Sequence, residues 1–220
     1  MTTQFGADFW EDHWRDAREG EHFQAEPHPY LASETSGLTP TSALDAGCGR
    51  GAEALWLAAQ GWQVTGADIS PTALAYAVAQ AEAADLADRV AWVAADLSTW
   101  RPERLFDLVI TSYAHPAMPQ LAFYERLATW LAPGGTLLIV GHLHGGDHGG
   151  DHGGDHEHGH GHGHAHQPHD GPPVEATVTL SDVTALLAAP EWLVETAAEH
   201  QREAGAHVLH DFVVRARRVA

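Results

Sequence analysis

The stretch Ala43-Leu-Asp-Ala-Gly-Cys-Gly-Arg-Gly51 joins an apolar run to an acid and three alternating glycines. The apolar run predicts a buried strand, and the glycines predict a turn in which no side chain keeps a ligand away from the backbone. Residues 52–60 are expected to form the following helix, which Gly61 is placed to end. Because the first N–H groups of a helix attract anionic groups, the stretch predicts a nucleotide-binding turn.

A second apolar run, residues 62–67, ends at Asp68, 17 residues after Gly51. A carboxylate just past a second strand can accept hydrogen bonds from both hydroxyls of a ribose. Two cofactors compete for such a site, since Gly47-x-Gly49-x-x-Ala52 also satisfies the loose dinucleotide pattern G-x-G-x-x-G/A. Asp45 would repel a pyrophosphate but attract the sulfonium and ammonium groups of S-adenosylmethionine, so charge favours the second cofactor.

These residues resemble the first motif of the class I S-adenosylmethionine-dependent methyltransferases, an acid followed by G-x-G-x-G, here Asp45 to Gly51. Three further stretches resemble later motifs of that family, in order: the third strand with the acid near the adenine amine at residues 90–96, the fourth strand at 106–112, and the corner and fifth strand at 131–140. The resemblance covers roughly residues 5–141 and 174–218. Four motifs at ordered spacing indicate the family more strongly than one glycine motif does.

The resemblance implies a single domain over residues 1–220 with an α/β, Rossmann-like fold. Its sheet would have seven mostly parallel strands in the order 3-2-1-4-5-7-6, with the last strand antiparallel and helices on both faces. The implied cofactor is S-adenosyl-L-methionine, and the implied cofactor-binding residues are Asp45, Gly47, Cys48, Gly49, Gly51, Asp68, Ile69, Asp96, Leu97 and Ser112.

The substrate side of the site has fewer signals. His115 lies just beyond the fourth strand, where the family places substrate-facing residues, so it is the candidate catalytic residue; a structural histidine is an equally good interpretation. Cys48 fits a small residue packed behind the cofactor better than a nucleophile, because nothing basic adjoins it in sequence. Asp107 fits either a surface turn or the site.

The N-terminal segments Phe9-Trp-x-x-x-Trp14 and Glu26-Pro-His-Pro-Tyr30 resemble those of small-molecule methyltransferases of the tellurite-resistance and thiopurine type. Residues 1–38 are therefore expected to form a helical lid, with short helices over 7–18 and 28–36. The candidate lid residues are Trp10, Trp14 and Tyr30. The two tryptophans lie one helical turn apart, which also fits a role in attaching the first helix to the core.

The remaining elements follow from helix and strand signals. Ser70 followed by Pro71 is a strong helix start, because serine caps the first N–H groups and proline suits the first turn. Further helices are expected over 118–131, stopped by Pro133-Gly-Gly135, and over 181–187. The last two strands are expected over 192–197 and 207–216, paired as an antiparallel hairpin.

Composition narrows the class of partner. The 11 basic residues are all arginine and face 30 acidic residues, so the formal charge of −19 disfavours nucleic acid and anionic membranes as partners. A single cysteine excludes an internal disulfide, and no run approaches the roughly 20 apolar residues of a membrane-spanning helix. These features lead us to expect a cytoplasmic protein whose partner is a small-molecule acceptor. The oligomeric state is left open.

Residues 142–170 form a histidine-rich insertion with two registers. Gly-Gly-Asp-His repeats every four residues, and histidines then alternate with glycine or alanine. Neutral imidazoles bind Zn²⁺, Ni²⁺ and Cu²⁺, and such a segment buries too little apolar area to fold alone, so we expect a metal-binding loop. A tolerated surface expansion and a pH response are the alternatives. The candidate metal ligands are His142, His144, His148, His152, His156, His158, His160, His162, His164, His166 and His169.

From its sequence, the chain is expected to transfer a methyl group to a thiol, chalcogen or hydroxyl group of a small-molecule acceptor. The chemistry implied is in-line displacement at the sulfonium methyl, to which an enzyme contributes proximity, alignment and water exclusion. A general base matters only for hydroxyl or amine acceptors. Two other functions remain open: a metal-sequestering or metal-responsive protein on the same fold, and an NAD(P)-dependent oxidoreductase.

Overall fold

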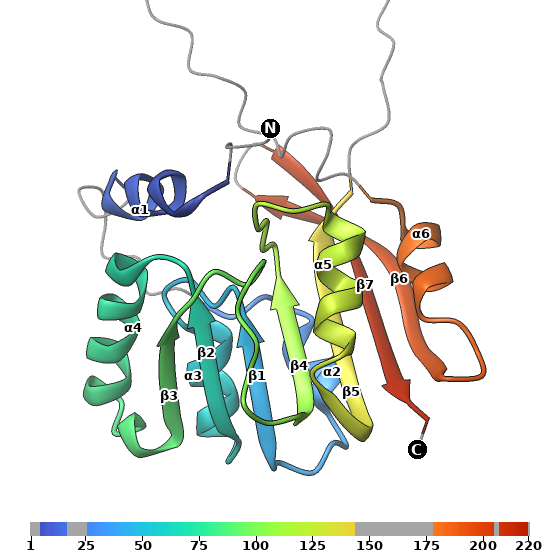
Figure 1. Cartoon of the computed structure of the whole chain (residues 1–220), viewed down its shortest axis with the longest axis horizontal. Helices are drawn as coiled ribbons and strands as arrows, with labels where there is room; N and C mark the ends of the chain where they lie inside the picture. Colours follow the sequence, from blue (N-terminus) through green and yellow to red (C-terminus); the bar gives the residue numbers. More distant parts are fainter. Residues whose placement is uncertain (1–4, 17–25, 144–177, 205–206, 220) are drawn as a thin grey trace, which may run out of the picture.

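The computed structural model describes residues 5–16, 26–143, 178–204 and 207–219. They form one seven-stranded sheet in the order β3-β2-β1-β4-β5-β7-β6 (Figure 1). The five strands from β3 to β5 are parallel, and β7 runs antiparallel to both β5 and β6. The strands are β1 (Ser42–Ala46), β2 (Gln63–Asp68), β3 (Val90–Ala94), β4 (Phe106–Ser112), β5 (Leu131–His142), β6 (Trp192–Ala204) and β7 (His207–Arg218).

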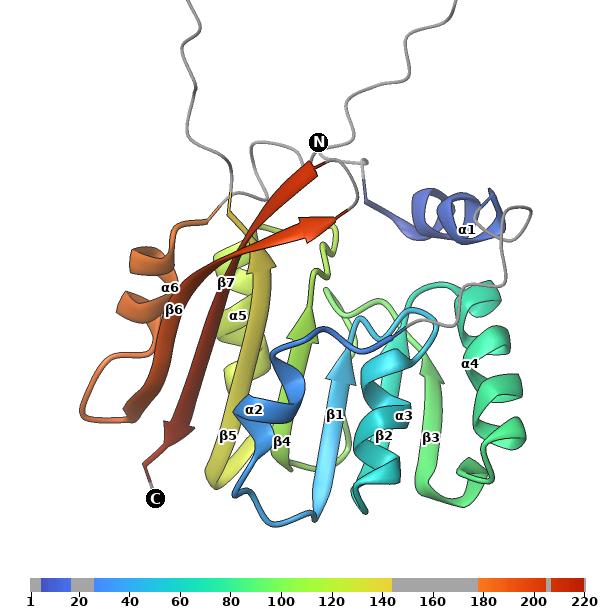
Figure 2. The same ribbon diagram turned by 180° about the vertical axis from the view of Figure 1, so that it is seen from behind.

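Helices cover both faces of the sheet (Figures 1 and 2). On one face α5 and α6 pack on an apolar core that includes Phe106, Phe123 and Phe212. On the other face α2 and α3 pack on a second core that includes Leu31 and Leu57. The helices are α1 (Ala7–Asp16), α2 (Leu31–Thr35), α3 (Ala52–Ala59), α4 (Pro71–Ala83), η1 (Ala87–Arg89), α5 (Gln120–Ala128) and α6 (Leu180–Leu186).

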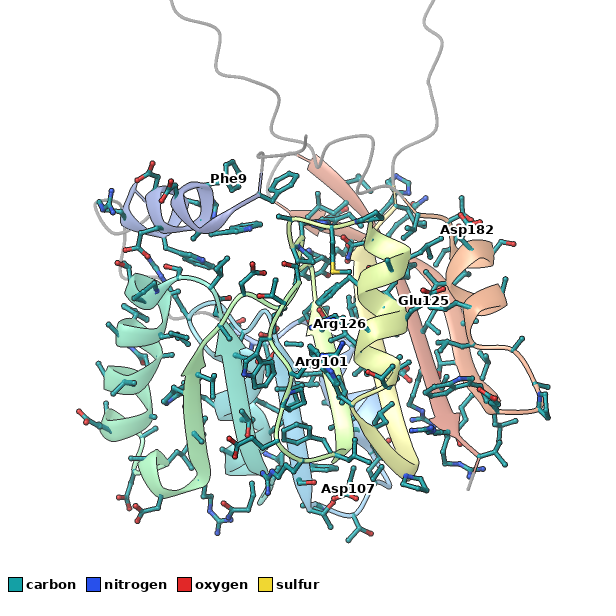
Figure 3. All side chains as sticks on the ribbon, viewed as in Figure 1. Phe9, Arg101, Asp107, Glu125, Arg126 and Asp182 are labelled. Carbon is teal, nitrogen blue, oxygen red and sulfur yellow. The ribbon has the colours of Figure 1, made fainter. Side chains whose placement is uncertain are left out.

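Helix α1 lies across the carboxyl ends of the parallel strands, next to the start of α4 (Figures 1 and 2). Loops that follow the carboxyl ends of parallel strands form the ligand crevice of open α/β sheets. The position of α1 therefore makes it a cover for that crevice. Phe9 is on the outer side of the helix and is 43% exposed (Figure 3).

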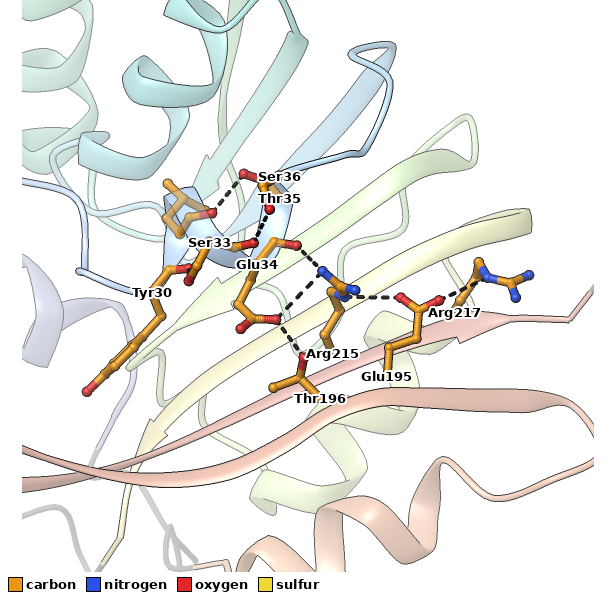
Figure 4. Close-up of polar contacts among 10 residues, drawn as sticks. Tyr30, Ser33, Glu34, Thr35, Ser36, Glu195, Thr196, Arg215 and Arg217 are labelled. Carbon is orange, nitrogen blue, oxygen red and sulfur yellow. Dashed lines mark hydrogen bonds and ion pairs between the residues drawn. The ribbon is translucent and has the colours of Figure 1, made fainter.

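Helix α2 is tied to the β6–β7 hairpin by a chain of polar contacts (Figure 4). Arg215 donates to the backbone oxygen of Glu34 at 2.7 Å and forms an ion pair with Glu195 at 3.0 Å. Thr196 donates to the Glu34 carboxylate at 2.8 Å. These contacts fix α2 against the hairpin, and so they also hold the neighbouring residues 28–30 near it.

Most expected elements are confirmed, including the order of the strands and the antiparallel last strand. Ser70 caps α4 by accepting from the backbone of Ala73 at 3.2 Å, with Pro71 in the first turn. Two expected elements, one helix and the last hairpin, have different residue bounds in the structure. The helix expected over 118–131 ends at Ala128, because Leu131 already pairs with Phe106 in the sheet, so Pro133-Gly-Gly135 lies within β5 rather than ending the helix.

The second error concerns the hairpin. β6 continues to Ala204, well beyond the expected 192–197, because it stays paired with β7 along its whole length, and β7 ends at Arg218, close to the expected 207–216. The extra length of β6 projects beyond the rest of the sheet toward the crevice (Figure 2). Among the described helices, none is both long and apolar enough to cross a membrane.

Candidate active site

A cavity of about 620 Å³ opens at the carboxyl ends of β1, β2 and β4, within the usual size range of small-molecule sites. Its walls come from α1, residues 26–29, the turn after β1, the end of β2, the loops after β3 and β4, and β6. The residues that line it are Phe5, Trp10, His13, Trp14, Glu26, Pro27, His28, Pro29, Gly47, Cys48, Gly49, Arg50, Ala52, Glu53, Asp68, Ile69, Asp96, Leu97, Ser112, Tyr113, Ala114, His115, Pro116 and Arg202.

The glycine turn after β1 lets neighbouring residues pack directly against its backbone. Gly47 has φ +83°, and a Cβ there would lie 2.4 Å from the Cβ of Ala114. A Cβ on Gly49 would lie 2.8 Å from the ring of Trp14, so this glycine lets α1 come down onto the turn. Gly51 packs behind the turn, where a Cβ would overlap Trp92 at 2.5 Å. The first two glycines shape the cavity, and the third allows the helix to pack on the sheet.

Asp68 fixes this turn from the end of β2. Its Oδ2 accepts from the backbone N–H of Gly49 at 2.8 Å, and its Oδ1 accepts from Ser70 at 2.9 Å. Each carboxylate oxygen has a second lone pair, so both oxygens can still accept a hydroxyl donor from a ligand. The side chain is 7% exposed and lines the cavity, which suits recognition of a ribose diol.

The loop after β3 carries Asp96 and Leu97 into the cavity. Asp96 accepts from the backbone of Ser98 at 2.8 Å. Arg126 of α5 holds the same loop, donating to the backbone oxygens of Leu97 at 2.9 Å and Trp100 at 2.5 Å (Figure 3). The loop is thus fixed on both sides before any ligand binds.

Three carboxylates are buried together beneath the turn. Burial raises the pKa of Asp45, and the neighbouring charges of Glu53 and Asp68 raise it further. Burial also raises the pKa values of Glu53 and Asp68. Asp45 Oδ2 is buried without a hydrogen-bond partner among the described residues. A positively charged ligand group would relieve this crowding of negative charge, whereas a phosphate would add to it.

Cys48 lies among these acids and is 4% exposed. Burial, with the charges of Asp45 and Asp68, raises the pKa of its thiol well above the ordinary value. Because the thiolate is the reactive form, the burial and the raised pKa of this cysteine fit packing in the turn better than action as a nucleophile.

Helix α1 is fastened over the cavity by Glu11. Its carboxylate accepts from the Ser70 hydroxyl at 2.6 Å and from the backbone and hydroxyl of Thr72 at the start of α4. Trp10 donates its indole N–H to the backbone oxygen of His115 at 3.2 Å. The guanidinium of Arg50 lies over the ring of Trp14 at 5.3 Å. Polar contacts therefore bind α1 to the glycine turn, to α4 and to the loop after β4.

On the opposite wall, Asp211 of β7 collects four donors. Tyr30 and Tyr113 each donate a hydroxyl to Oδ2 at 3.1 Å, Arg202 donates Nε to Oδ2 at 2.6 Å, and His142 Nδ1 lies 3.0 Å from Oδ1. Burial alone would raise the pKa of Asp211, but the hydrogen bond and charge of Arg202, with the two hydroxyls, outweigh burial and lower that pKa. We call Asp211 and these four partners the Asp211 cluster.

Two members of the Asp211 cluster reach the cavity, Tyr113 and Arg202. Tyr113 has φ +56°, a left-handed conformation that costs a non-glycine residue roughly 1–2 kcal/mol. Its backbone N–H is bound to Val140 at 2.9 Å, and its ring stacks on His142 at 4.3 Å. Strained residues of this kind concentrate at functional sites.

His28 and His115 bring two imidazoles into the cavity. Burial lowers the pKa of His28 to about 4 and also lowers the pKa of His115, which favours the neutral form of both rings. His115 Nδ1 lies 3.2 Å from Oε1 of Gln120. Both ring nitrogens of His28 are buried and have no hydrogen-bond partner among the described residues.

Most of the residues that the sequence indicated come together here. The cavity is lined by Gly47, Cys48, Gly49, Asp68, Ile69, Asp96, Leu97, Ser112, His115, Trp10 and Trp14. Asp45 and Gly51 lie behind the lining, and Tyr30 points to Asp211 instead. His142 packs in the Asp211 cluster, and the other ten histidines of the insertion lie outside the described residues. In the described part of the chain, no group of three or more His, Cys, Asp or Glu side chains could hold a metal ion.

The polar residues of the wall that were not among the candidates from sequence include His28, Glu53, Tyr113 and Arg202. Glu53 is in the first turn of the helix after the glycines, a position that a search for acids near the turn could have found. His28 sits between two prolines inside the segment Glu26 to Tyr30, from which only Tyr30 was taken as a candidate. Tyr113 and Arg202 carry no local signal, because only the length of β6 and the left-handed turn after β4 bring them to the site.

A sheet of this order, with a glycine turn after β1 and an acid ending β2, is the class I methyltransferase fold. Residues 43–135 match the family model described as "Methyltransferase domain". The matched segment includes β1 to β4 and all of the glycine turn, so this part of the chain is similar to a methyltransferase domain.

Curated methyltransferases match this chain over part of their length. The chain is 38% identical to a trans-aconitate 2-methyltransferase of Streptomyces avermitilis over 44% of this chain and 38% of that protein. It is 34% identical to thiocyanate methyltransferase 1 of Arabidopsis thaliana over 48% of each. The chain thus matches less than half the length of these two proteins, so their acceptors are not transferred to this chain.

Solved structures resemble the whole fold. TehB of Haemophilus influenzae aligns with a TM-score of 0.62 at 15% identity, covering 95% of this chain and 67% of that chain. The Burkholderia thailandensis 1,6-didemethyltoxoflavin-N1-methyltransferase aligns with a TM-score of 0.66 at 21% identity, covering 97% and 87%. These similarities support the fold, including the hairpin that the family model leaves out.

Proposed function

We propose that this chain transfers a methyl group from S-adenosylmethionine to a small-molecule acceptor. The observation that carries the proposal is the group of buried carboxylates Asp45, Glu53 and Asp68 beneath a turn free of side chains. Bound S-adenosylmethionine supplies a methyl group that the positive charge on sulfur has already activated. The same carboxylates disfavour the pyrophosphate of a nicotinamide dinucleotide, which argues against an oxidoreductase.

Each part of the cavity then has a task. Asp68 would accept the ribose hydroxyls, and the loop of Asp96 and Leu97 would hold the base. Helix α1, with Trp10 and Trp14, would exclude water and align the acceptor, as the lid expected over residues 1–38. The acceptor is a small molecule with a thiol, chalcogen or hydroxyl group. Thiocyanate, thiol and trans-aconitate methyltransferases among the relatives support a small acceptor.

Calorimetry tests the cofactor. We expect S-adenosylmethionine and S-adenosylhomocysteine to bind and NADH not to bind. Gly47→Ala should weaken S-adenosylhomocysteine binding more than tenfold, since the added Cβ would displace Ala114 from the cavity wall. Gly134→Ala is the matched control, because Gly134 has φ +79° but nothing within 4 Å of an added Cβ. Tight binding of NADH instead would contradict the proposal.

The histidine-rich insertion supports a separate proposal, that it binds Zn²⁺, Ni²⁺ or Cu²⁺. Its support is the spacing of its histidines in the sequence. Replacing residues 144–169 with a short Gly/Ser link would spare His142 and the Asp211 cluster. Metal binding should disappear and methyl transfer should persist. Metal affinity that survives the replacement would place the ligands elsewhere.

A further inference from the structure

The acceptor end of the cavity contains an imidazole that makes no hydrogen bond with any residue the structure describes. His28 is 7% exposed, and neither ring nitrogen has a partner among the described residues. Its backbone is held, since its N–H donates to Glu53 Oε1 at 3.1 Å and its carbonyl accepts from Leu31 at 3.2 Å. A buried polar atom without a partner costs roughly 1–3 kcal/mol. The two ring nitrogens therefore destabilise the free protein, and a bound molecule with hydrogen-bonding groups would give them partners.

In the second imidazole, that of His115, the contact with Gln120 decides which ring nitrogen carries the proton. Gln120 is 3% exposed, and its Nε2 donates to the backbone oxygen of Ala114 at 2.9 Å. That bond fixes the amide so that Oε1 is the atom 3.2 Å from His115 Nδ1. An amide oxygen only accepts, so Nδ1 must carry the proton of the neutral ring and Nε2 must carry the lone pair. Gln120 is thus a positioning residue that leaves His115 a proton acceptor at Nε2.

The charges of the cavity disfavour an anionic acceptor. In the lining of the cavity, Glu53, Asp68 and Asp96, with Asp45 directly behind, serve the cofactor as proposed above, which leaves the carboxylate of Glu26 for the acceptor half. Two arginines line the cavity, and both are engaged: Arg202 is paired with Asp211 at 2.6 Å, and Arg50 lies between the rings of Trp14 and Tyr76. Phe5, Trp10 and Trp14 add an aromatic surface that suits a planar or apolar body.

We propose that the acceptor is an uncharged small molecule with a proton on its nucleophilic atom, that His28 hydrogen-bonds it, and that Nε2 of His115 takes up its proton. The proposal rests on the methyltransferase function proposed above. The acceptor's lone pair forms the bond to the methyl carbon, the carbon–sulfur electrons remain on sulfur, and the proton moves to Nε2. After release of the product, the imidazolium returns the proton to solvent. Hydroxyl, ring N–H and un-ionised thiol acceptors fit this class; thiocyanate and carboxylates do not.

Nitrogen-15 NMR of the imidazoles tests which ring nitrogen of His115 carries the proton, and it needs no acceptor. In the S-adenosylhomocysteine complex we expect the Nδ1–H form of His115 in the wild type and a mixture of both neutral forms in Gln120→Leu. An Nε2–H ring in the wild type overturns the proposal, whichever acceptors are turned over.

A set of four probe acceptors tests the class: catechol and benzimidazole as uncharged proton donors, thiocyanate and trans-aconitate as anions. We expect transfer to the uncharged probes to fall about a hundredfold or more in His115→Asn, which keeps a donor toward Gln120 but lacks Nε2. His210→Asn, outside the lining, is the control. Transfer to the anions alone overturns this proposal and leaves the proposed function standing, whereas failure to bind S-adenosylmethionine overturns the function itself.

His28→Leu separates binding from structure. We expect the Michaelis constant for an uncharged probe to rise about tenfold, S-adenosylhomocysteine affinity to stay unchanged, and the melting temperature to rise, because two unpaired buried nitrogens are removed. A lower melting temperature with an unchanged Michaelis constant would show that His28 is a packing residue and would overturn its part in the proposal.

Discussion

The two halves of the cavity are built by different means. The cofactor half comes from short stretches that directly follow β1, β2 and β3, and its shape depends on glycines and on acids at strand ends. The acceptor half comes from segments far apart in the chain: Tyr30 and Asp211, which meet in the Asp211 cluster, are 181 positions apart. Local rules decide the first half, and the packing of the whole molecule decides the second.

The contrast also appears in the charges. In the cofactor half, carboxylates lie close together and burial raises their pKa values, so this half is incomplete without a positive ligand. In the acceptor half, Asp211 has its own cation and hydroxyl donors, and its pKa is lowered. The first half is arranged for binding at a cost in stability, whereas the second stabilises the wall that receives the acceptor.

Asp211→Ala should have the largest effect on stability. The substitution leaves Arg202, Tyr30 and Tyr113 without their common acceptor, so the free energy of unfolding should fall by about 2–4 kcal/mol in urea titrations. Since the folded-state pKa is lowered, this stabilisation is present above the unfolded pKa of about 4 and is lost as pH falls through the folded value. S-adenosylhomocysteine affinity should change little. A loss of affinity as large as the loss of stability would show that the halves are one unit.

Asp68→Ala should have its main effect on cofactor affinity rather than on stability. Removing the carboxylate at the end of β2 should weaken S-adenosylhomocysteine binding about ten- to a hundredfold, about 1.5–3 kcal/mol, because the ribose hydroxyls lose their acceptor. Calorimetry measures the change. Asp107→Ala is the matched control: this carboxylate accepts from Ser42 at 2.7 Å, at the opposite end of the sheet from the cavity (Figure 3). Equal losses in the two variants would remove Asp68 from the site.

The same contrast explains what the sequence could predict. Glycine spacing, strand-end acids and the Ser70–Pro71 cap act through neighbours in the chain, so the strand order and most of the cofactor half follow from the pattern. Arg202 could not be predicted, because its place depends on β6 and β7 staying paired to Ala204. Nor could the Nδ1 partner of His115, since Gln120 is oriented by a backbone oxygen that only the fold brings near.

Glu53→Gln probes the boundary between the halves, where Glu53 accepts from the backbone of His28 at 3.1 Å. Burial raises the pKa of Glu53, so its charge destabilises the free protein at neutral pH, and that cost disappears as pH falls toward the unfolded pKa of about 4.3. The variant should therefore be more stable than the wild type at pH 7 and equally stable at low pH. Thermal melts at both pH values measure the difference.

The same substitution should weaken S-adenosylmethionine binding about fivefold at pH 7, or about 1 kcal/mol, because one carboxylate facing a cation is lost. In the wild type, a bound cation lowers the raised pKa values of Asp45, Glu53 and Asp68, so binding releases protons and affinity falls as pH drops through those values. The variant should show a shallower dependence in calorimetry over a pH series. An unchanged slope would exclude Glu53 from the charge balance.

Glu11→Ala should have the smallest effect, because it loosens only the helix that lies over both halves. The carboxylate caps the start of α4 through Ser70 and Thr72, a contact worth at most about 1 kcal/mol. Hydrogen exchange should quicken in residues 7–16 while the sheet stays protected. Since closure chiefly aligns the acceptor, turnover should fall more than S-adenosylhomocysteine affinity. Asp12→Ala is the control, because the Asp12 side chain is 67% exposed and, among the described residues, pairs with Arg15 of the same helix alone. Equal losses of turnover and affinity would mean that α1 belongs to the cofactor half alone.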